Sequence, residues 1–203
     1  MKRKITIFAL VFILGLSFGT FAADLEIVSL NSYTDSIGYL NVVGEIKNNS
    51  EQNVNYVQPV VSFKNSSGDT IDSSSTYTFL DVLKPGQTAP FKVSIKNSED
   101  IAEYAVQVQG SYGGSKRNLE ITNSNSNVDS IGYLNVNGEI KNNSNSDLQY
   151  VEVIASFYNK NGEIVDAAYT YAQMDIVNAG STSPFKISIQ NKDSIEKYKL
   201  QVQ

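Results

Sequence analysis

The sequence contains no cysteine and no histidine. Without these two residue types, neither a serine–histidine nor a cysteine–histidine nucleophilic site can be built, and the usual zinc ligands are missing. The absence of cysteine also excludes disulfide bonds and a lipid-modified N-terminal cysteine, so an apolar core alone must stabilise each domain. The glycine-rich loops GxxxxGK[ST] and GxGxxG, which hold phosphates and dinucleotides, are absent as well. No cofactor is therefore expected.

The N-terminus has the pattern of an export signal. Basic residues at positions 2–4 precede an apolar run over 5–21, which is followed by Ala22 and Ala23. A basic start, a short apolar stretch and small residues at a cut site are typical of a secretory signal peptide. We expect cleavage between Ala22 and Ala23, with an uncleaved membrane anchor as the alternative. The mature protein is then secreted or held at the cell surface, or in a periplasm if the host has one, without a membrane span.

Positive charge is scarce. The chain has 16 Lys and Arg against 21 Asp and Glu, a formal net charge of −5. Loss of the leader removes three basic residues and no acid, which leaves 13 basic residues against 21 acidic ones and a net charge of −8. Because an acidic surface repels phosphate groups, nucleic acid and anionic membrane surfaces are not expected partners.

An internal repeat organises the rest of the chain. The segment from Asp35 to Val42 recurs letter for letter from Asp129 to Val136, an offset of 94 residues that holds to the C-terminus. Solenoid units run roughly 20 to 50 residues, so this repeat is a whole duplicated domain. The predicted parts are a signal peptide at 1–22, a first domain at 23–109, a Gly/Ser-rich linker at 110–118 and a second domain at 119–203.

Apolar and polar residues alternate within each copy, which is the period of a strand with one buried and one wet face. Leu40, Val42 and Ile46 are expected to face a core. Glu45 and Lys47 are expected to face water on the opposite side of the same strand.

Turn and breaker residues separate these runs. Asn161-Gly162 predicts a hairpin, and Pro59 predicts that its strand lies at an edge or is bulged. One helical turn is expected over 98–102. With six or seven short strands in about 85 residues per copy, the pattern favours an all-β fold of two tandem immunoglobulin-like, Greek-key β-sandwiches. A small barrel is the alternative.

Several runs of the second copy resemble the FxLYD domain family. They are Gly138–Ser144, Tyr150-Val151, Ser156–Gly162 and Pro184–Lys186. The motif behind the family name is matched in part, since residues 155–159 read Ala-Ser-Phe-Tyr-Asn. The resemblance implies immunoglobulin-like sandwich domains of exported prokaryotic proteins, without an established enzymatic role. It carries over no functional residue, because the matching positions are core and turn positions.

Carboxylates are the remaining catalytic and metal-binding candidates. Four acidic positions recur in both copies: Asp35/Asp129, Asp72/Asp166, Asp81/Asp175 and Glu45/Glu139. Glycoside hydrolysis needs two carboxylates roughly 5–9.5 Å apart, and the spacing pairs none of these, so turn capping and solvated strand faces are expected instead. The segment 123–129 could supply oxygens to calcium, but it lacks a calcium-loop motif and a polar loop is the default. No metal site is predicted.

Aromatic residues and glycosylation sequons complete the candidates. The chain has 12 Tyr and 9 Phe but no Trp. The tyrosines that could stack on sugar rings, if they are not half-buried in the core, are Tyr39, Tyr77, Tyr112, Tyr158 and Tyr171. Three N-x-[ST] sequons mark possible glycosylation sites at Asn48, Asn65 and Asn142.

Three functions remain open. The first is a non-catalytic surface or secreted module that binds an envelope glycan or a partner protein. The second is a structural spacer or assembly unit that extends reach or pairs edge strands. The third is a carboxylate-based hydrolase, which the dispersed acidic residues disfavour.

Overall fold

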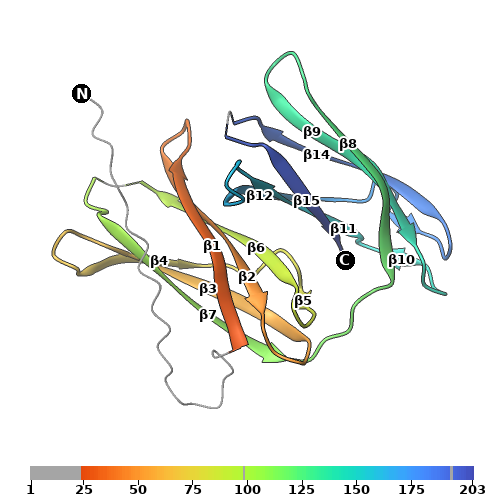
Figure 1. The fold of residues 1–203 in the computed structure, drawn as a ribbon, viewed down its shortest axis with the longest axis horizontal. Coiled ribbons are helices and arrows are strands. Elements are labelled where there is room, and N and C mark those ends of the chain that lie inside the picture. The colour runs from red at the N-terminus through yellow and green to blue at the C-terminus, as the bar shows by residue number, and fades with distance from the viewer. Residues whose placement is uncertain (1–23, 98, 193) are drawn as a thin grey trace. The chain divides into compact units, whose positions relative to one another are not determined.

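The computed structural model describes residues 24–97, 99–192 and 194–203, so the expected leader, with Ala22 and Ala23, lies outside the described residues. The chain divides into two compact units, the first ending at Gly114 and the second running from Ser115 to Gln203 (Figure 1). Both units consist of strands joined by turns, without a helix in the described part of the chain. The predicted all-β class is therefore confirmed.

Seven strands form the first unit: β1 (Leu25–Thr34), β2 (Tyr39–Asn48), β3 (Val54–Lys64), β4 (Thr70–Ser75), β5 (Val82–Leu83), β6 (Thr88–Lys96) and β7 (Glu103–Tyr112). Eight strands form the second: β8 (Leu119–Val128), β9 (Tyr133–Asn142), β10 (Leu148–Gln149), β11 (Glu152–Tyr158), β12 (Ile164–Tyr171), β13 (Ile176–Val177), β14 (Thr182–Gln190) and β15 (Lys197–Val202). At the offset of 94, β10 and β11 together correspond to β3, and every other strand has one counterpart.

Each unit contains two main antiparallel sheets, and the second unit adds a separate two-stranded one. In the first unit β2 lies between β1 and β6, while β3 pairs with β7 on one side and with β4 and β5 on the other. In the second unit the sheets are β14-β9-β8 and β12-β11-β15, with β10 paired to β13. The chain changes sheet between β2 and β3, between β5 and β6 and again between β6 and β7. This is an immunoglobulin-like sandwich, and its two separate sheets exclude the closed-barrel alternative.

Apolar side chains from both sheets fill the space between them. In the first unit Val42 and Phe91 come from one sheet and Val61 and Phe63 from the other, and all four are fully buried. Burying one such side chain contributes roughly 1.5–3 kcal/mol. The alternation therefore places the core as predicted, and this core stabilises each domain without disulfide bonds.

The outer face of β2 is more buried than the alternation predicts, since Asn41 and Val43 are covered as well as Glu45. Glu45 is only 6% exposed, and the hydroxyl of Thr88 donates a hydrogen bond of 3.1 Å to its carboxylate. Its counterpart Glu139 is exposed, as expected. The prediction that Glu45 faces water is wrong, because period-2 patterning shows which side a residue takes but not what its neighbours cover.

Pro59 lies in a central strand, so the predicted edge position is wrong. β3 pairs with β7 along most of its length and with β4 only from Val60 onward. The carbonyl of Pro59 accepts a bond of 3.3 Å from Thr76, just beyond the end of β4. The proline is tolerated because its missing N–H faces the point where the ladder to β4 ends. The bulge that the sequence offered as an alternative does occur, a few residues earlier.

Two local predictions need correction. β7 continues through Gly110 to Tyr112, so the first three residues of the predicted linker are strand, while the division between units at Gly114 falls inside that linker. Residues 99 and 100 form a turn and residues 101–102 are irregular, so the expected helical turn is absent there, and Ser98 lies outside the described residues.

Candidate functional site

A tyrosine occupies a left-handed backbone conformation at the same place in both units. Tyr56 has φ 49° and Tyr150 has φ 52°, and the described residues contain no other non-glycine residue with positive φ. Tyr56 belongs to a bulge of β3, where the register with β7 shifts between Asn55 and Gln58. Glycine is favoured at a left-handed bulge position, and an L-residue there costs roughly 1–2 kcal/mol. The duplicated chain thus places a bulky aromatic residue twice where the backbone favours glycine.

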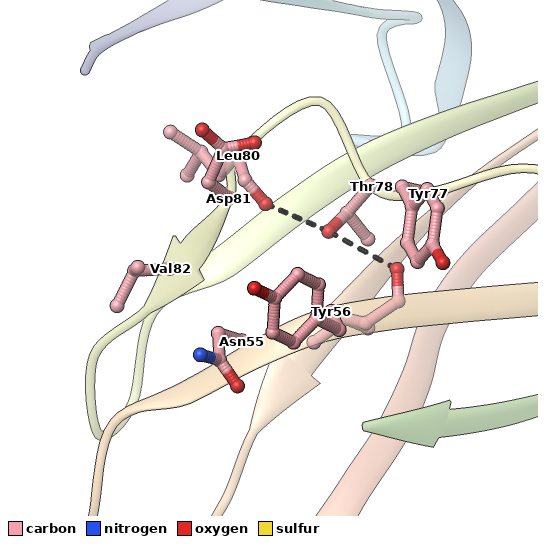
Figure 2. Close-up of a pocket in the computed structure, with 8 residues that line it drawn as sticks. Asn55, Tyr56, Tyr77, Thr78, Leu80, Asp81 and Val82 are labelled. Carbon is pink, nitrogen blue, oxygen red and sulfur yellow. Dashed lines mark hydrogen bonds between the residues drawn. The ribbon is translucent and has the colours of Figure 1, made fainter. Parts of the chain in front are cut away.

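Each of these tyrosines lines a pocket. The first pocket has a volume of about 410 Å³, and the second about 600 Å³. Figure 2 shows the first, with Asn55 and Tyr56 of β3 facing the segment that connects β4 to β5. The first pocket is lined by Asn55, Tyr56, Val57, Tyr77, Thr78, Leu80, Asp81 and Val82. The second is lined by Gln149, Tyr150, Val151, Tyr171, Ala172, Met174, Asp175 and Ile176.

The two linings correspond residue by residue at the offset of 94. Both pockets carry two tyrosines and one aspartate at identical places. Asn55 becomes Gln149, which keeps a carboxamide, and Leu80 becomes Met174, which keeps an aliphatic side chain. Aromatic rings, a carboxylate, a carboxamide and an apolar floor are therefore present twice.

The tyrosine rings are accessible. In the first pocket Tyr56 is 68% and Tyr77 55% exposed, and their ring centroids lie 6.5 Å apart at an interplanar angle of 65°. In the second, Tyr150 is 77% and Tyr171 54% exposed. The ring of Tyr169, which does not line the pocket, lies against that of Tyr171 with a centroid distance of 6.2 Å and an interplanar angle of 85°. Edge-to-face geometry leaves ring faces available for a flat ligand.

Backbone hydrogen bonds fix the wall of each pocket to its floor. The amide of Thr78 donates to the carbonyl of buried Val57 at 2.9 Å, and the Thr78 hydroxyl lies 2.8 Å from the carbonyl of Leu80 (Figure 2). In the second unit the amide of Ala172 donates to the carbonyl of Val151 at 2.8 Å. The rings are thus held on an ordered frame.

The residues at the bulge have different neighbours in the two units. In the first, Asn55 pairs with Ser111 of β7. In the second, the guanidinium of Arg117 donates to the carbonyls of Gln149 at 2.8 Å and Tyr150 at 3.1 Å. The same strained turn is therefore stabilised by strand pairing in one copy and by an arginine in the other.

Two of the three sequon asparagines anchor the short strand beside the pocket. Asn48 is fully buried, and its Nδ2 donates to the carbonyls of Gln52 at 2.7 Å and Leu83 at 2.9 Å. Asn142 is equally buried and makes the same pair of bonds, to Ser146 and Val177. Both hydrogens of each amide are used, so the folded domain has no room for a glycan at Asn48 or Asn142. The structure contradicts these two glycosylation predictions.

The third sequon asparagine is partly exposed. The Oδ1 atom of Asn65 accepts hydrogen bonds from the amides of Ser67 and Asp69, and its Nδ2 donates to the Asp69 carboxylate at 3.3 Å. This arrangement shapes the hairpin between β3 and β4. Glycosylation of Asn65 stays a prediction.

The structure places only two of the five candidate tyrosines in the pockets, Tyr77 and Tyr171. Tyr39 is 41% exposed at the start of β2, and Tyr158 is buried. The Tyr112 hydroxyl donates a hydrogen bond to the carboxylate of Asp24, and this bond is the main cause that raises the pKa of Tyr112.

The duplicated acidic residues belong to separate local networks. Asp35 accepts bonds from the amides of Ile37 and Tyr39, of which the Tyr39 bond contributes most to lowering its pKa. Asp129 accepts the equivalent bonds, and the amide of Tyr133 likewise contributes most to its lowered pKa.

The other acidic residues take different places in the two copies. Asp72 is exposed, whereas its counterpart Asp166 is buried and forms an ion pair of 2.7 Å with Lys192. Asp81 and Asp175 line the pockets. The duplicated acids therefore cap turns, pair with a lysine or line a pocket.

The calcium candidate takes a different form from the expected loop. Residues 123–128 lie within β8, where successive side chains point to opposite faces and do not converge on one ion. Among the described residues, no group of three or more His, Cys, Asp or Glu side chains could hold a metal ion.

No residue pattern pointed directly to Tyr56 and Tyr150. A positive φ at tyrosine is rare, so no propensity predicts it. The recurring Asn/Gln-Tyr-Val triplet at 55–57 and 149–151, just before an apolar strand, is the signal from which the pair could have been found.

Fold and site together define a class: a β-sandwich protein of two units, each with a tyrosine-lined pocket among its described residues. Within the described residues, no helix is long and apolar enough to cross a membrane.

The comparisons with known proteins assign the chain to no family. No protein-family model matches the chain, and no curated protein matches it. Among solved structures, it is similar to a red sea bream transglutaminase (8% identity, TM-score 0.27, 88% of this chain and 29% of that one). It is also similar to an exo-chitosanase from Amycolatopsis orientalis (14% identity, TM-score 0.27, 86% and 25%) and to a glycoside hydrolase family 2 β-glucuronidase (11% identity, TM-score 0.29, 86% and 23%). The chain spans less than a third of the length of each, and likenesses this weak do not bear on activity.

Proposed function

We propose that this protein is an exported, non-catalytic binding module whose two tyrosine pockets bind a glycan of the cell envelope. The observation that carries the proposal is the left-handed conformation of Tyr56 and Tyr150. Residues held in sparsely populated backbone regions cluster at functional sites, because elsewhere the strain brings no benefit. Here the strain points two exposed rings toward two equivalent pockets.

The lining suits a polyhydroxylated ligand with flat apolar faces. Exposed tyrosine rings offer π-surfaces to the C–H faces of a sugar ring, and the phenol hydroxyls add hydrogen-bonding groups. The Asp81 carboxylate can accept a charge-assisted bond from a sugar hydroxyl, and the Asn55 carboxamide can donate from its Nδ2 atom, since its Oδ1 atom is buried. A volume of about 410 Å³ lies within the usual range for small-ligand sites.

The same lining supports a binding role over a catalytic one. One aspartate lines each pocket, whereas glycoside hydrolysis ordinarily uses two carboxylates across the scissile bond. With no histidine or cysteine in the chain, the commonest nucleophilic mechanisms are excluded as well. Export through the N-terminal leader and membership of the FxLYD family stay predictions that are compatible with this role.

Co-sedimentation tests the proposal. The chain without residues 1–22 is mixed with insoluble chitin, cellulose, peptidoglycan and an envelope fraction of its host, and the bound fraction is measured. Three forms are compared: wild type, Tyr56→Ala with Tyr150→Ala, and the control Tyr39→Ala with Tyr133→Ala. The control removes two exposed tyrosines (41% and 42%) that are equivalent in the two domains but lie outside the pockets.

We expect retention on at least one glycan, a loss of at least tenfold in affinity for the pocket variant, and an unchanged affinity for the control. Retention that the control abolishes would place the site elsewhere. Retention on the envelope fraction that protease treatment of that fraction removes would identify a partner protein in place of a glycan. If wild type is retained by nothing at any salt concentration, the proposal is wrong and the spacer hypothesis gains support.

A further inference from the structure

We propose that the two pockets bind successive stretches of one repetitive glycan chain, so that the polymer is held bivalently. This inference rests on the proposed function and deepens it, because it names the ligand as a polymer and not a free sugar. The structural basis is the correspondence of all eight lining positions between two covalently linked domains.

Part of the surface outside the pockets has diverged between the two copies, although the segment 35–42, with its exposed Ile37, recurs unchanged at 129–136. On the first strand of each unit, Val28 corresponds to Thr122, Leu30 to Ser124 and Tyr33 to Asn127. Val28 is exposed and Leu30 and Tyr33 are half-buried, so these positions changed to polar residues without loss of the fold. The exposed tyrosines of the pockets kept both their type and their backbone geometry, strain included.

The pockets differ in shape while keeping their chemistry. Leu80 is buried in the floor of the first, whereas Met174 is 46% exposed in the second, which is the larger of the two. Methionine is unbranched and adapts its shape to what it contacts. Two related but non-identical pockets suit stretches of the same polymer that differ slightly in conformation.

The connection between the domains is short. β7 ends at Tyr112 and β8 begins at Leu119, which leaves residues 113–118 between them. A stretch of that length reaches at most about 20 Å when fully extended. Once one pocket has bound a polymer, a short link keeps the second pocket at an effective concentration on the order of millimolar with respect to the same chain. Weak individual sites then give a tight overall complex.

The test compares a polymer with its short fragment on the full mature chain. Wild type, Tyr56→Ala, Tyr150→Ala and the double variant are titrated with chitotetraose and cellotetraose by calorimetry, and with insoluble chitin and cellulose by co-sedimentation. Tyr39→Ala serves as the control. Tyr56→Gly is included because it removes the ring while relieving the backbone strain, so a loss of binding there is not a loss of folding.

Bivalent binding predicts that the wild-type chain binds two fragments and that each single variant binds one. It also predicts that the wild type binds the polymer at least tenfold more tightly than it binds the fragment. Each single variant should lose that tenfold advantage while still binding one fragment. If each single variant halves the polymer capacity without changing the affinity, the pockets act independently and the inference is wrong. If no fragment and no polymer binds, the proposed function itself fails, so the two failures are distinguishable.

Discussion

The strained tyrosines give the sharpest test of the physical reasoning. At Tyr56, alanine and glycine both remove the ring, but only glycine relieves the left-handed φ of 49°. That conformation costs an L-residue roughly 1–2 kcal/mol, and glycine loses roughly 0.5–1 kcal/mol more backbone entropy on folding than alanine. We therefore expect Tyr56→Gly to be more stable than Tyr56→Ala by about 0.5–1 kcal/mol, given these two costs.

The stability that Tyr56→Gly loses relative to wild type follows from how much of the Tyr56 side chain is buried. Tyr56 is 68% exposed, so about a third of its surface is buried. For a ring of about 200 Å², that is roughly 65 Å², or about 1.5 kcal/mol at 25 cal/mol per Å². With the entropy cost of glycine added and the relief of strain subtracted, Tyr56→Gly should cost only about 1 kcal/mol.

Tyr39 gives the matched control, because it has the same side chain without a positive φ. At 41% exposure it buries about 120 Å², so Tyr39→Gly should cost about 3–4 kcal/mol. There the order should reverse, with alanine more stable than glycine by about 0.5–1 kcal/mol.

Urea denaturation followed by far-UV circular dichroism measures the relative stability of the glycine and alanine variants at both positions, Tyr56 and Tyr39. Equivalent changes are made at Tyr150 and Tyr133, so that the transitions of the two domains shift together. An alanine variant at Tyr56 that equals or exceeds the glycine variant in stability would show that the left-handed turn is unstrained. The reason for assigning function to this position would then disappear.

Three further predictions concern the frame of the domains. Asn48→Ala removes the side-chain donor to the buried carbonyl of Leu83 and one of the two donors to the carbonyl of Gln52. It should lower the free energy of unfolding by about 2–3 kcal/mol in urea denaturation, whereas a loss below about 1 kcal/mol would mean that water replaces the amide. In Gly44→Ala the new Cβ would lie 2.6 Å from Cε1 of buried Phe91, so we expect a loss of about 2–3 kcal/mol, and an unchanged urea midpoint would contradict that packing. The pKa of Asp35 and of Asp129 lies below the ordinary 3.8, so the unfolded state binds more protons in acid. Their stabilisation is present above about pH 3.8 and is lost as the pH falls through the folded value. The stability difference between wild type and the variant with both aspartates changed to asparagine should therefore shrink below pH 4 and stay constant between pH 5 and 7.

Much of the fold could be predicted from the chain alone. The repeat is explicit in the sequence, and the alternation around Val42 and Val136 places the core face correctly, because a buried sheet face demands apolar residues at every second position. Glu45 shows the limit of this reasoning. Whether an outward-facing residue is buried depends on neighbouring strands that the pattern of one strand does not describe.

The candidate site was predictable only in part. Tyr77 and Tyr171 were candidates by residue type, but Tyr39, Tyr112 and Tyr158 were equally good ones. Asn48 matched a modification motif, and yet the fold uses its amide as an internal anchor. Residue type alone does not distinguish these roles, since the roles depend on which backbone groups lie within hydrogen-bonding distance.

The sequence by itself determined the domain duplication, the strand periodicity and the exclusion of chemistry that needs histidine or cysteine. Each of these follows from residue identity and spacing along the chain. Only the tertiary structure decided that Tyr56 and Tyr150 take a left-handed conformation and that each lines a pocket with an aspartate from a segment about 25 residues away. The conformation of a bulge is set by the register of the strands on both sides of it, and that register forms only when distant segments pair.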